Sequence, residues 1–107
     1  MSQTHRYIDV PVECIEEVGG FYFRSIVLPK CGDRVPQHEH DHDHVTYVGN
    51  GSVLAWADGK ELGYFAAGRA VPIKAGAIHE FEAQEDNTRL ACVHNVASAD
   101  SIKEKGL

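Results

Sequence analysis

Histidine is concentrated in one short segment of this chain. His38, His40, His42 and His44 occupy alternate positions within seven residues, and His79 follows a glycine turn further along. Imidazole is the commonest protein ligand for late first-row transition metals. Five of the seven histidines are therefore placed as if to build one metal site.

A straight strand cannot direct all four clustered histidines at one ion. It rises about 3.3 Å per residue, which would separate His38 from His44 by about 20 Å, whereas ligands lie about 2.0–2.1 Å from a shared metal. His38 and His40 can chelate together because residues two apart face the same side. His44 can join them only if the chain turns at Asp41-His42-Asp43, and aspartate favours turns. We therefore expect His42 to lie at the tip, outside the ligand set.

The fourth ligand, His79, must come from another part of the sheet, where it begins a strand after a glycine turn. Four neutral imidazoles leave the charge of the metal uncompensated, which favours an anionic ligand or substrate. Nitrogen ligands suit Fe, Mn, Ni, Zn or Cu better than Mg or Ca. We expect one divalent transition metal, chosen from that group, with a small-molecule ligand or substrate.

The elements that position these residues are predicted to be short strands. Apolar stretches recur about every 8 to 12 residues between glycine, proline, aspartate and asparagine, which is typical of an all-β sandwich or barrel. Hairpin turns are expected at Gly19-Gly20, Gly49-Asn50-Gly51 and Asp58-Gly59, a polar loop at Glu85-Asp86-Asn87 and a tight turn at Lys74-Ala75-Gly76. The expected strands are Glu13–Glu17, Phe21–Leu28, Arg34–His40, Val45–Val48, Ser52–Ala57, Lys60–Phe65, Ala70–Ile73, His79–Ala83 and Arg89–Asn95.

Alternation within the strands predicts which side chains share a face. Thr46 and Val48 should lie on the same side as His44, and Phe81 on the same side as His79, with Glu80 facing away. Leu54 and Trp56 share one face. The aromatic residues expected to form the core or line the barrel are Phe21 or Phe23, Tyr47, Trp56 and Phe81.

Composition bounds the class of protein. The 107 residues suffice for one domain, residues 1–107, with a core of about 13–95 and a polar tail at 98–107. The net charge of -6, from 16 acidic and 10 basic residues, argues against nucleic-acid binding. No apolar run approaches the roughly 20 residues of a membrane span, and no signal sequence opens the chain, so we expect a cytoplasmic protein. Three cysteines without close pairs form no disulfide framework.

The spacing of the histidines resembles the two motifs of the cupin superfamily. Gly32 is followed by five residues, His38-x-His40, three residues, His44, six residues and Gly51, with His44 where most cupins have glutamate. In the second motif, Gly68 is followed by five residues, Lys74-x-Gly76, two residues and His79. Lys74 replaces a proline there, and Ala83 replaces an asparagine.

The resemblance implies a single-domain jelly-roll β-barrel with a metal in its mouth, held by His38, His40, His44 and His79. Cupins with all-histidine sites include dioxygenases, so a dioxygenase-type oxidoreductase acting on a small organic anion is one hypothesis. A non-catalytic module that binds metal and a small ligand is the second. A cupin lyase or isomerase is less favoured, because Thr46 stands where some small cupin lyases carry tyrosine.

Two further expectations stay open at this point. His94 either points into the barrel near the site or forms hydrogen bonds within the sheet. The resemblance also implies a homodimer, formed by strand exchange or sheet packing, in which the strands before Gly32 take part.

Overall fold

The chain folds as two β-sheets. The computed structural model describes residues 6–7, 12–38 and 43–95, and these form ten strands. The strands are β1 (Arg6–Tyr7), β2 (Val12–Val18), β3 (Phe21–Leu28), β4 (Asp33–His38), β5 (His44–Asn50), β6 (Ser52–Ala57), β7 (Lys60–Ala66), β8 (Ala70–Ile73), β9 (His79–Ala83) and β10 (Thr88–Asn95). Within those residues, no helix is long and apolar enough to cross a membrane.

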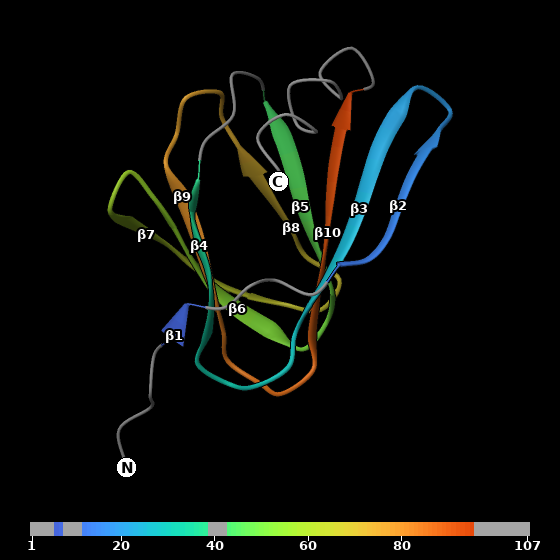
Figure 1. Ribbon diagram of the computed structural model, residues 1–107. Coiled ribbons are helices and arrows are strands. Elements are labelled where there is room, and N and C mark those ends of the chain that lie inside the picture. The colour runs from blue at the N-terminus through green and yellow to red at the C-terminus, as the bar shows by residue number, and fades with distance from the viewer. Residues whose placement is uncertain (1–5, 8–11, 39–42, 96–107) are drawn as a thin grey trace.

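Each sheet has five strands, and the chain passes repeatedly between them. The first sheet has the order β1-β4-β9-β6-β7 and the second the order β2-β3-β10-β5-β8 (Figure 1). All pairs are antiparallel except β1 with β4. The predicted all-β jelly-roll architecture is confirmed, and β1 is the strand that the sequence pattern did not predict.

Two of the predicted hairpin turns lie at the strand ends where they are expected from the sequence. Gly19 and Gly20 have φ of 58° and 86°, and Asp58 and Gly59 have φ of 51° and 78°. These left-handed conformations suit the tight turns of hairpins, which is why the glycine and aspartate pairs separate β2 from β3 and β6 from β7. The loop between β9 and β10 likewise turns at Asn87, whose φ is 56°.

The core lies between the facing sheets and comes from both. In β5 the burial alternates, with His44, Thr46 and Val48 inside, as predicted. In β9 Phe81 is 2% exposed and shares the inner face with His79. The apolar side chains of the core are Ile26, Leu28, Val35, Val48, Val53, Ala55, Val71, Ile73, Phe81, Ala83 and Leu90.

The predicted core role of several aromatic residues is wrong. Phe21 and Tyr47 are 52% and 44% exposed, on the outer face of the second sheet, and Phe23 is half-buried there. Inward-facing His44 and Thr46 fix the phase of β5, and this turns Tyr47 outward. Trp56 is half-buried on the outer face of the first sheet, because its neighbour Ala55 points into the core.

Candidate metal centre

His79 is the first residue of β9 and has no exposed surface. Hydrogen bonds hold the residue that precedes it. Before it, the carboxylate of Asp58 accepts the Ile78 N–H at 2.9 Å, and the Asp58 N–H donates to the Ile78 carbonyl at 2.7 Å. The ring Nδ1 lies 3.2 Å from the Ala77 carbonyl oxygen. A carbonyl only accepts, so this hydrogen bond places the ring proton on Nδ1 and the lone pair on Nε2. Metal-binding histidines commonly have this arrangement.

His44 approaches His79 from the opposite sheet. It is the first residue of β5 and is 6% exposed. The two ring centroids are 5.1 Å apart, and the ring planes are inclined at 56°. A ligating imidazole has its centroid about 3.2 Å from the metal, so two ligands at a tetrahedral angle have centroids about 5.2 Å apart. The separation of His44 from His79 therefore fits two ligands of one ion.

His38, another predicted ligand, is the last residue of β4, and its backbone lies directly opposite His79 in the ladder. Between Val35 and His38 the register shifts: three steps along β4 match two steps along β9, from Phe81 to His79. This is the signature of a β-bulge, a feature that is frequent beside functional sites because it redirects a strand. The bulge aligns the two histidine positions that the sequence predicts to act together.

The described residues contain only part of the predicted ligand set. His40 and His42 lie outside them, and for His38 the backbone position alone is described. Among the side chains of the described ranges, no group of three or more histidine, cysteine, aspartate or glutamate residues is arranged to hold a metal ion. His44 and His79 are thus the pair on which a metal centre is judged, and the tautomer and spacing of this pair fit nitrogen ligation.

His94, whose role the sequence left open, lies in this cluster. It is 2% exposed, and its ring stacks on that of His44 with centroids 4.4 Å apart and planes inclined at 18°. The ring of Tyr22 contacts the His94 ring edge-on, with centroids 6.2 Å apart. The alternation of the strand could have shown this, because residues two and four positions apart share a face. His94 is two residues from Cys92 and four from the inward-facing Leu90.

The layer below this stack is also polar. Thr46 and Cys92 are direct partners in the β5–β10 ladder, and the hydroxyl lies 3.6 Å from the thiol sulfur. Burial raises the pKa of the Cys92 thiol, while the hydrogen bond with Thr46 and the charge of Arg24 oppose this rise in part. The thiol therefore stays neutral at physiological pH.

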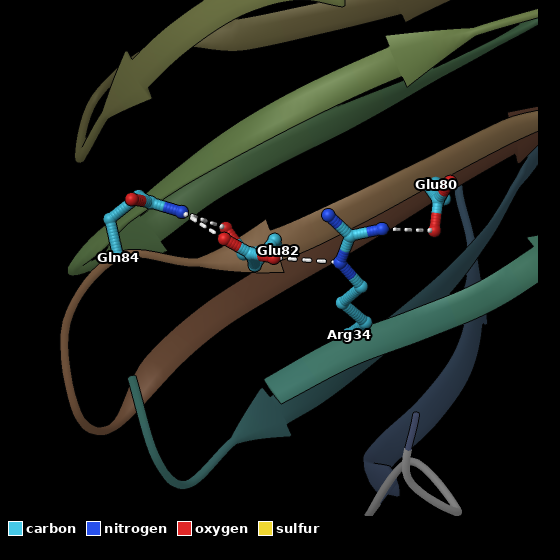
Figure 2. Close-up of polar contacts among 4 residues, drawn as sticks. All are labelled: Arg34, Glu80, Glu82 and Gln84. Atoms are coloured by element: carbon cyan, nitrogen blue, oxygen red, sulfur yellow. Dashed lines mark hydrogen bonds and ion pairs between the residues drawn. The ribbon is translucent and has the colours of Figure 1, made fainter. Parts of the chain in front are cut away.

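On the outer face, an ion-pair cluster joins the strands that carry His38 and His79 (Figure 2). Arg34 on β4 donates from Nε to Glu82 at 2.6 Å and from Nη1 to Glu80 at 3.3 Å. Gln84 donates to the other Glu82 oxygen at 3.0 Å, and the guanidinium lies 4.7 Å from the Trp56 ring centroid. Glu80 faces away from His79, as predicted. The cluster fixes the register of β4 against β9 from the side opposite the candidate centre.

A pocket of about 430 Å³ opens at the rim of the second sheet, across the ends of β3, β10, β5 and β8. Its mostly apolar lining includes the buried His44 and His94, with Asp43 and Lys74 at the edge. The Asp43 carboxylate accepts the Ala75 N–H at 2.8 Å. The pocket gives a small molecule with an apolar body access to the histidine cluster.

Comparison with solved structures finds the same architecture in several proteins. An RmlC-like cupin with a double-stranded β-helix fold from Methanocaldococcus jannaschii has a TM-score of 0.71 and 13% identity, over 94% of this chain and 96% of that chain. A cupin superfamily protein from Desulfitobacterium hafniense has a TM-score of 0.69 and 12% identity, over 88% and 84%. A cupin-2 domain containing protein from Shewanella frigidimarina has a TM-score of 0.62 and 20% identity, over 85% and 83%.

No protein-family model matches the chain, and no curated protein matches it. At 12 to 20% identity, the likeness to these solved structures is one of fold. The two five-stranded sheets of this chain face each other, and the TM-scores of 0.62, 0.69 and 0.71 show that those proteins share this fold. The chain therefore has the cupin fold, a jelly-roll double-stranded β-helix.

Proposed function

We propose that this chain is a metal-binding cupin in which His38, His40, His44 and His79 hold one divalent transition metal. The observation that carries the proposal is the pairing of His44 with His79. Their rings come from opposite sheets to a centroid separation of 5.1 Å, and the hydrogen bond to Ala77 puts the ring proton of His79 on Nδ1, so Nε2 is the nitrogen that carries the lone pair. The register of His38 opposite His79 supports a third ligand.

A bound metal of this group would supply Lewis-acid or redox chemistry. The apolar walls of the rim pocket would exclude water from a small ligand beside His44. The ammonium of Lys74 at the pocket edge favours an anion, as do four uncharged ligands around a cation. We therefore propose a dioxygenase-type oxidoreductase that acts on a small organic anion.

The second candidate is a module that binds metal and a small ligand without converting it. One observation favours it. Asp43 is the carboxylate among the described lining residues of the pocket, and it already accepts the Ala75 N–H at 2.8 Å. This hydrogen bond engages the described carboxylate of the pocket with the backbone, and a binding module needs no general base.

Metal titration of the metal-free protein tests the proposed centre. We expect His44→Ala and His79→Ala each to weaken Co(II) or Zn(II) binding by at least about 100-fold, more than losses caused by changing the partners of ligands. His42→Ala is the matched control, because it removes a histidine from the same segment and is predicted not to be a ligand.

The control also separates a built site from a surface tract that scavenges metal. If His42→Ala weakened binding as much as His44→Ala, and His79→Ala had no effect, the metal would be bound by the histidine-rich segment alone. That result would refute the proposed centre.

Oxygen uptake distinguishes the two candidate functions. Protein loaded with Fe(II) is mixed with a panel of small organic acids in an oxygen electrode, with Zn(II)-loaded protein as the control. Acid-dependent oxygen consumption with iron and none with zinc supports the oxidoreductase. Tight binding of an acid without consumption of oxygen or acid supports the binding module.

We also propose that the partner is a second copy of this chain, docked on the outer face of the second sheet. Phe23, Val93, Val45 and Pro72 form one cross-strand row there, from β3 to β8. Val93, Val45 and Pro72 also line the rim pocket, so the second copy would border the proposed ligand site. Tyr47 lies beside the row, and this apolar face includes β3, which precedes Gly32. Exposed apolar patches of this kind mark interaction sites.

Sedimentation analysis tests the dimer. We expect Tyr47→Glu to convert a dimer into a monomer. Tyr64→Glu is the matched control, because Tyr64 is 57% exposed on the first sheet and should leave the dimer intact. A wild-type protein that sediments as a monomer at all concentrations would refute this contact.

A further inference from the structure

We propose that His94 is a positioning residue of the metal centre, which holds the plane of the His44 ring without binding the metal itself. The inference rests on the proposed function, because it takes His44 as a ligand. It assigns a role to a histidine that lies outside the predicted set of four.

The geometry of the stack separates the two roles. A metal lies close to the plane of the imidazole that binds it, about 2.1 Å from the nitrogen. The planes of His44 and His94 are inclined at only 18°. At an ordinary contact separation of about 3.5 Å, such planes meet roughly 11 Å from the rings. One ion therefore cannot lie in both planes, and His94 cannot share a metal with His44.

The contrast with His79 supports this assignment. Its plane is inclined at 56° to that of His44, so the two planes intersect close to both rings. The three buried rings thus form two different pairs. The His44–His79 pair can converge on an ion, and the His44–His94 pair is a stack of the kind that aromatic rings form to fix their relative orientation.

His94 is well placed to act as the fixed member of the stack. It lies on β10, which is paired with β3 on one side and β5 on the other. Its ring is 2% exposed and contacts Tyr22 edge-on, at an interplanar angle of 65°. His44, by contrast, is the first residue of its strand. The ring at the strand end is therefore supported by the ring on the central strand.

Two substitutions of His94 test the role. His94→Phe keeps a flat ring and removes the nitrogens, whereas His94→Ala removes both. Each full-length variant is titrated with Co(II), whose visible absorption reports the number and arrangement of the ligands. We expect His94→Phe to bind within about 3-fold of wild type with an unchanged spectrum, and His94→Ala to bind about 10- to 100-fold more weakly.

Each other outcome overturns the proposal in a distinct way. If His94→Phe binds as weakly as His94→Ala and its spectrum changes, His94 is a ligand. If neither variant loses affinity, the stack has no positioning role. If the wild-type protein fails to bind Co(II), or His44→Ala binds normally, the metal centre itself is refuted, and the role of His94 in it falls too.

A readout without metal checks the stack independently. In the metal-free protein, the ring protons of His44 lie beside the His94 ring and experience its ring current. We expect their NMR shifts to keep the sign of the ring-current displacement in His94→Phe, whose phenyl ring has a stronger ring current, and to lose that displacement in His94→Ala. A folded His94→Ala variant with unchanged His44 shifts would show that the stack does not exist in solution.

Discussion

Replacing Arg34 with methionine should destabilise the barrel more than any ordinary surface substitution. The side chains of Glu82 and Glu80 are 2% and 9% exposed, and Arg34 is 19% exposed. Breaking a buried ion pair by removing one partner costs about 3–5 kcal/mol, whereas exposed pairs contribute about 0–1 kcal/mol. Because Arg34 is partly exposed, we expect Arg34→Met to lower the free energy of unfolding by about 2–4 kcal/mol.

A loss of this size is a large part of the stability of a small domain, which is about 5–15 kcal/mol in total. At about 4 °C per kcal/mol, the melting temperature should fall by about 8–16 °C. Urea unfolding followed by tryptophan fluorescence measures the change, since Trp56 is the single tryptophan and contacts Arg34. Lys60→Met is the control, because it removes an exposed cation from β7.

A double variant tests the role of the buried carboxylates in the same assay. Adding Glu82→Gln to Arg34→Met removes one of the carboxylates left without its cation, so the double variant should recover part of the lost stability. The reasoning is refuted if Arg34→Met costs no more than Lys60→Met. It is also refuted if adding Glu82→Gln to Arg34→Met lowers the free energy of unfolding as much as Glu82→Gln alone lowers it in the wild-type protein.

Three further results are expected from the fold. Gly51→Ala should unfold the protein at much lower urea than Gly19→Ala, because φ at Gly51 is 74° and a Cβ there would clash with the Thr88 side chain and lie 3.0 Å from the Thr88 Cα, whereas Gly19 has no atom within 4 Å of that position. Equal effects of the two variants would contradict the crowding. In a thiol-labelling assay of the folded protein, the exposed Cys31 should react quickly and Cys92 slowly. Because burial raises the pKa of Cys92, its thiolate forms more easily in the unfolded state, so unfolding free energy should fall as the pH rises above about 9, and a Cys92→Ala variant should lose this part of the fall.

Much of the fold could be predicted because turn residues mark the strand ends. The bounds of four strands match the prediction: Phe21–Leu28, Ser52–Ala57, Ala70–Ile73 and His79–Ala83. The glycines and the aspartate with positive φ at Gly19-Gly20 and Asp58-Gly59 form the turns between the two strands of each hairpin, regardless of distant contacts. β1 was missed, because two residues carry no periodic pattern and this strand forms through its pairing with β4.

Which face of a strand is buried could not be read from alternation alone. In β6 both phases are apolar, and the large Trp56 was expected inside. The structure instead buries Val53 and Ala55, because Ala55 lies directly opposite Phe81 in the ladder and a small residue makes room for that ring. Size complementarity between strands far apart in the sequence decided the phase, and a single sequence does not show it.

The candidate site was predicted in part. The resemblance and the strand phase placed His44 and His79 on inner faces, and the described structure brings their rings together. The stack of His94 on His44 and the ion pairs of Arg34 depend on register between strands. That register follows from the whole barrel, so these contacts appear only once the sheets are assembled.

The inner face of the β5–β10 pair changes character along its length. His44 and His94 stack at one end, Thr46 and Cys92 meet next, and Val48 and Leu90 join the apolar core. From His44 to Val48 the strand rises about 13 Å, and substitutions more than about 7–10 Å apart usually have additive effects on stability. Changes in the histidine layer should therefore leave the energetics of the apolar layer nearly untouched. The barrel therefore keeps its histidine layer apart from its apolar layer, so residues at the one end can be exchanged while the other end keeps the chain folded.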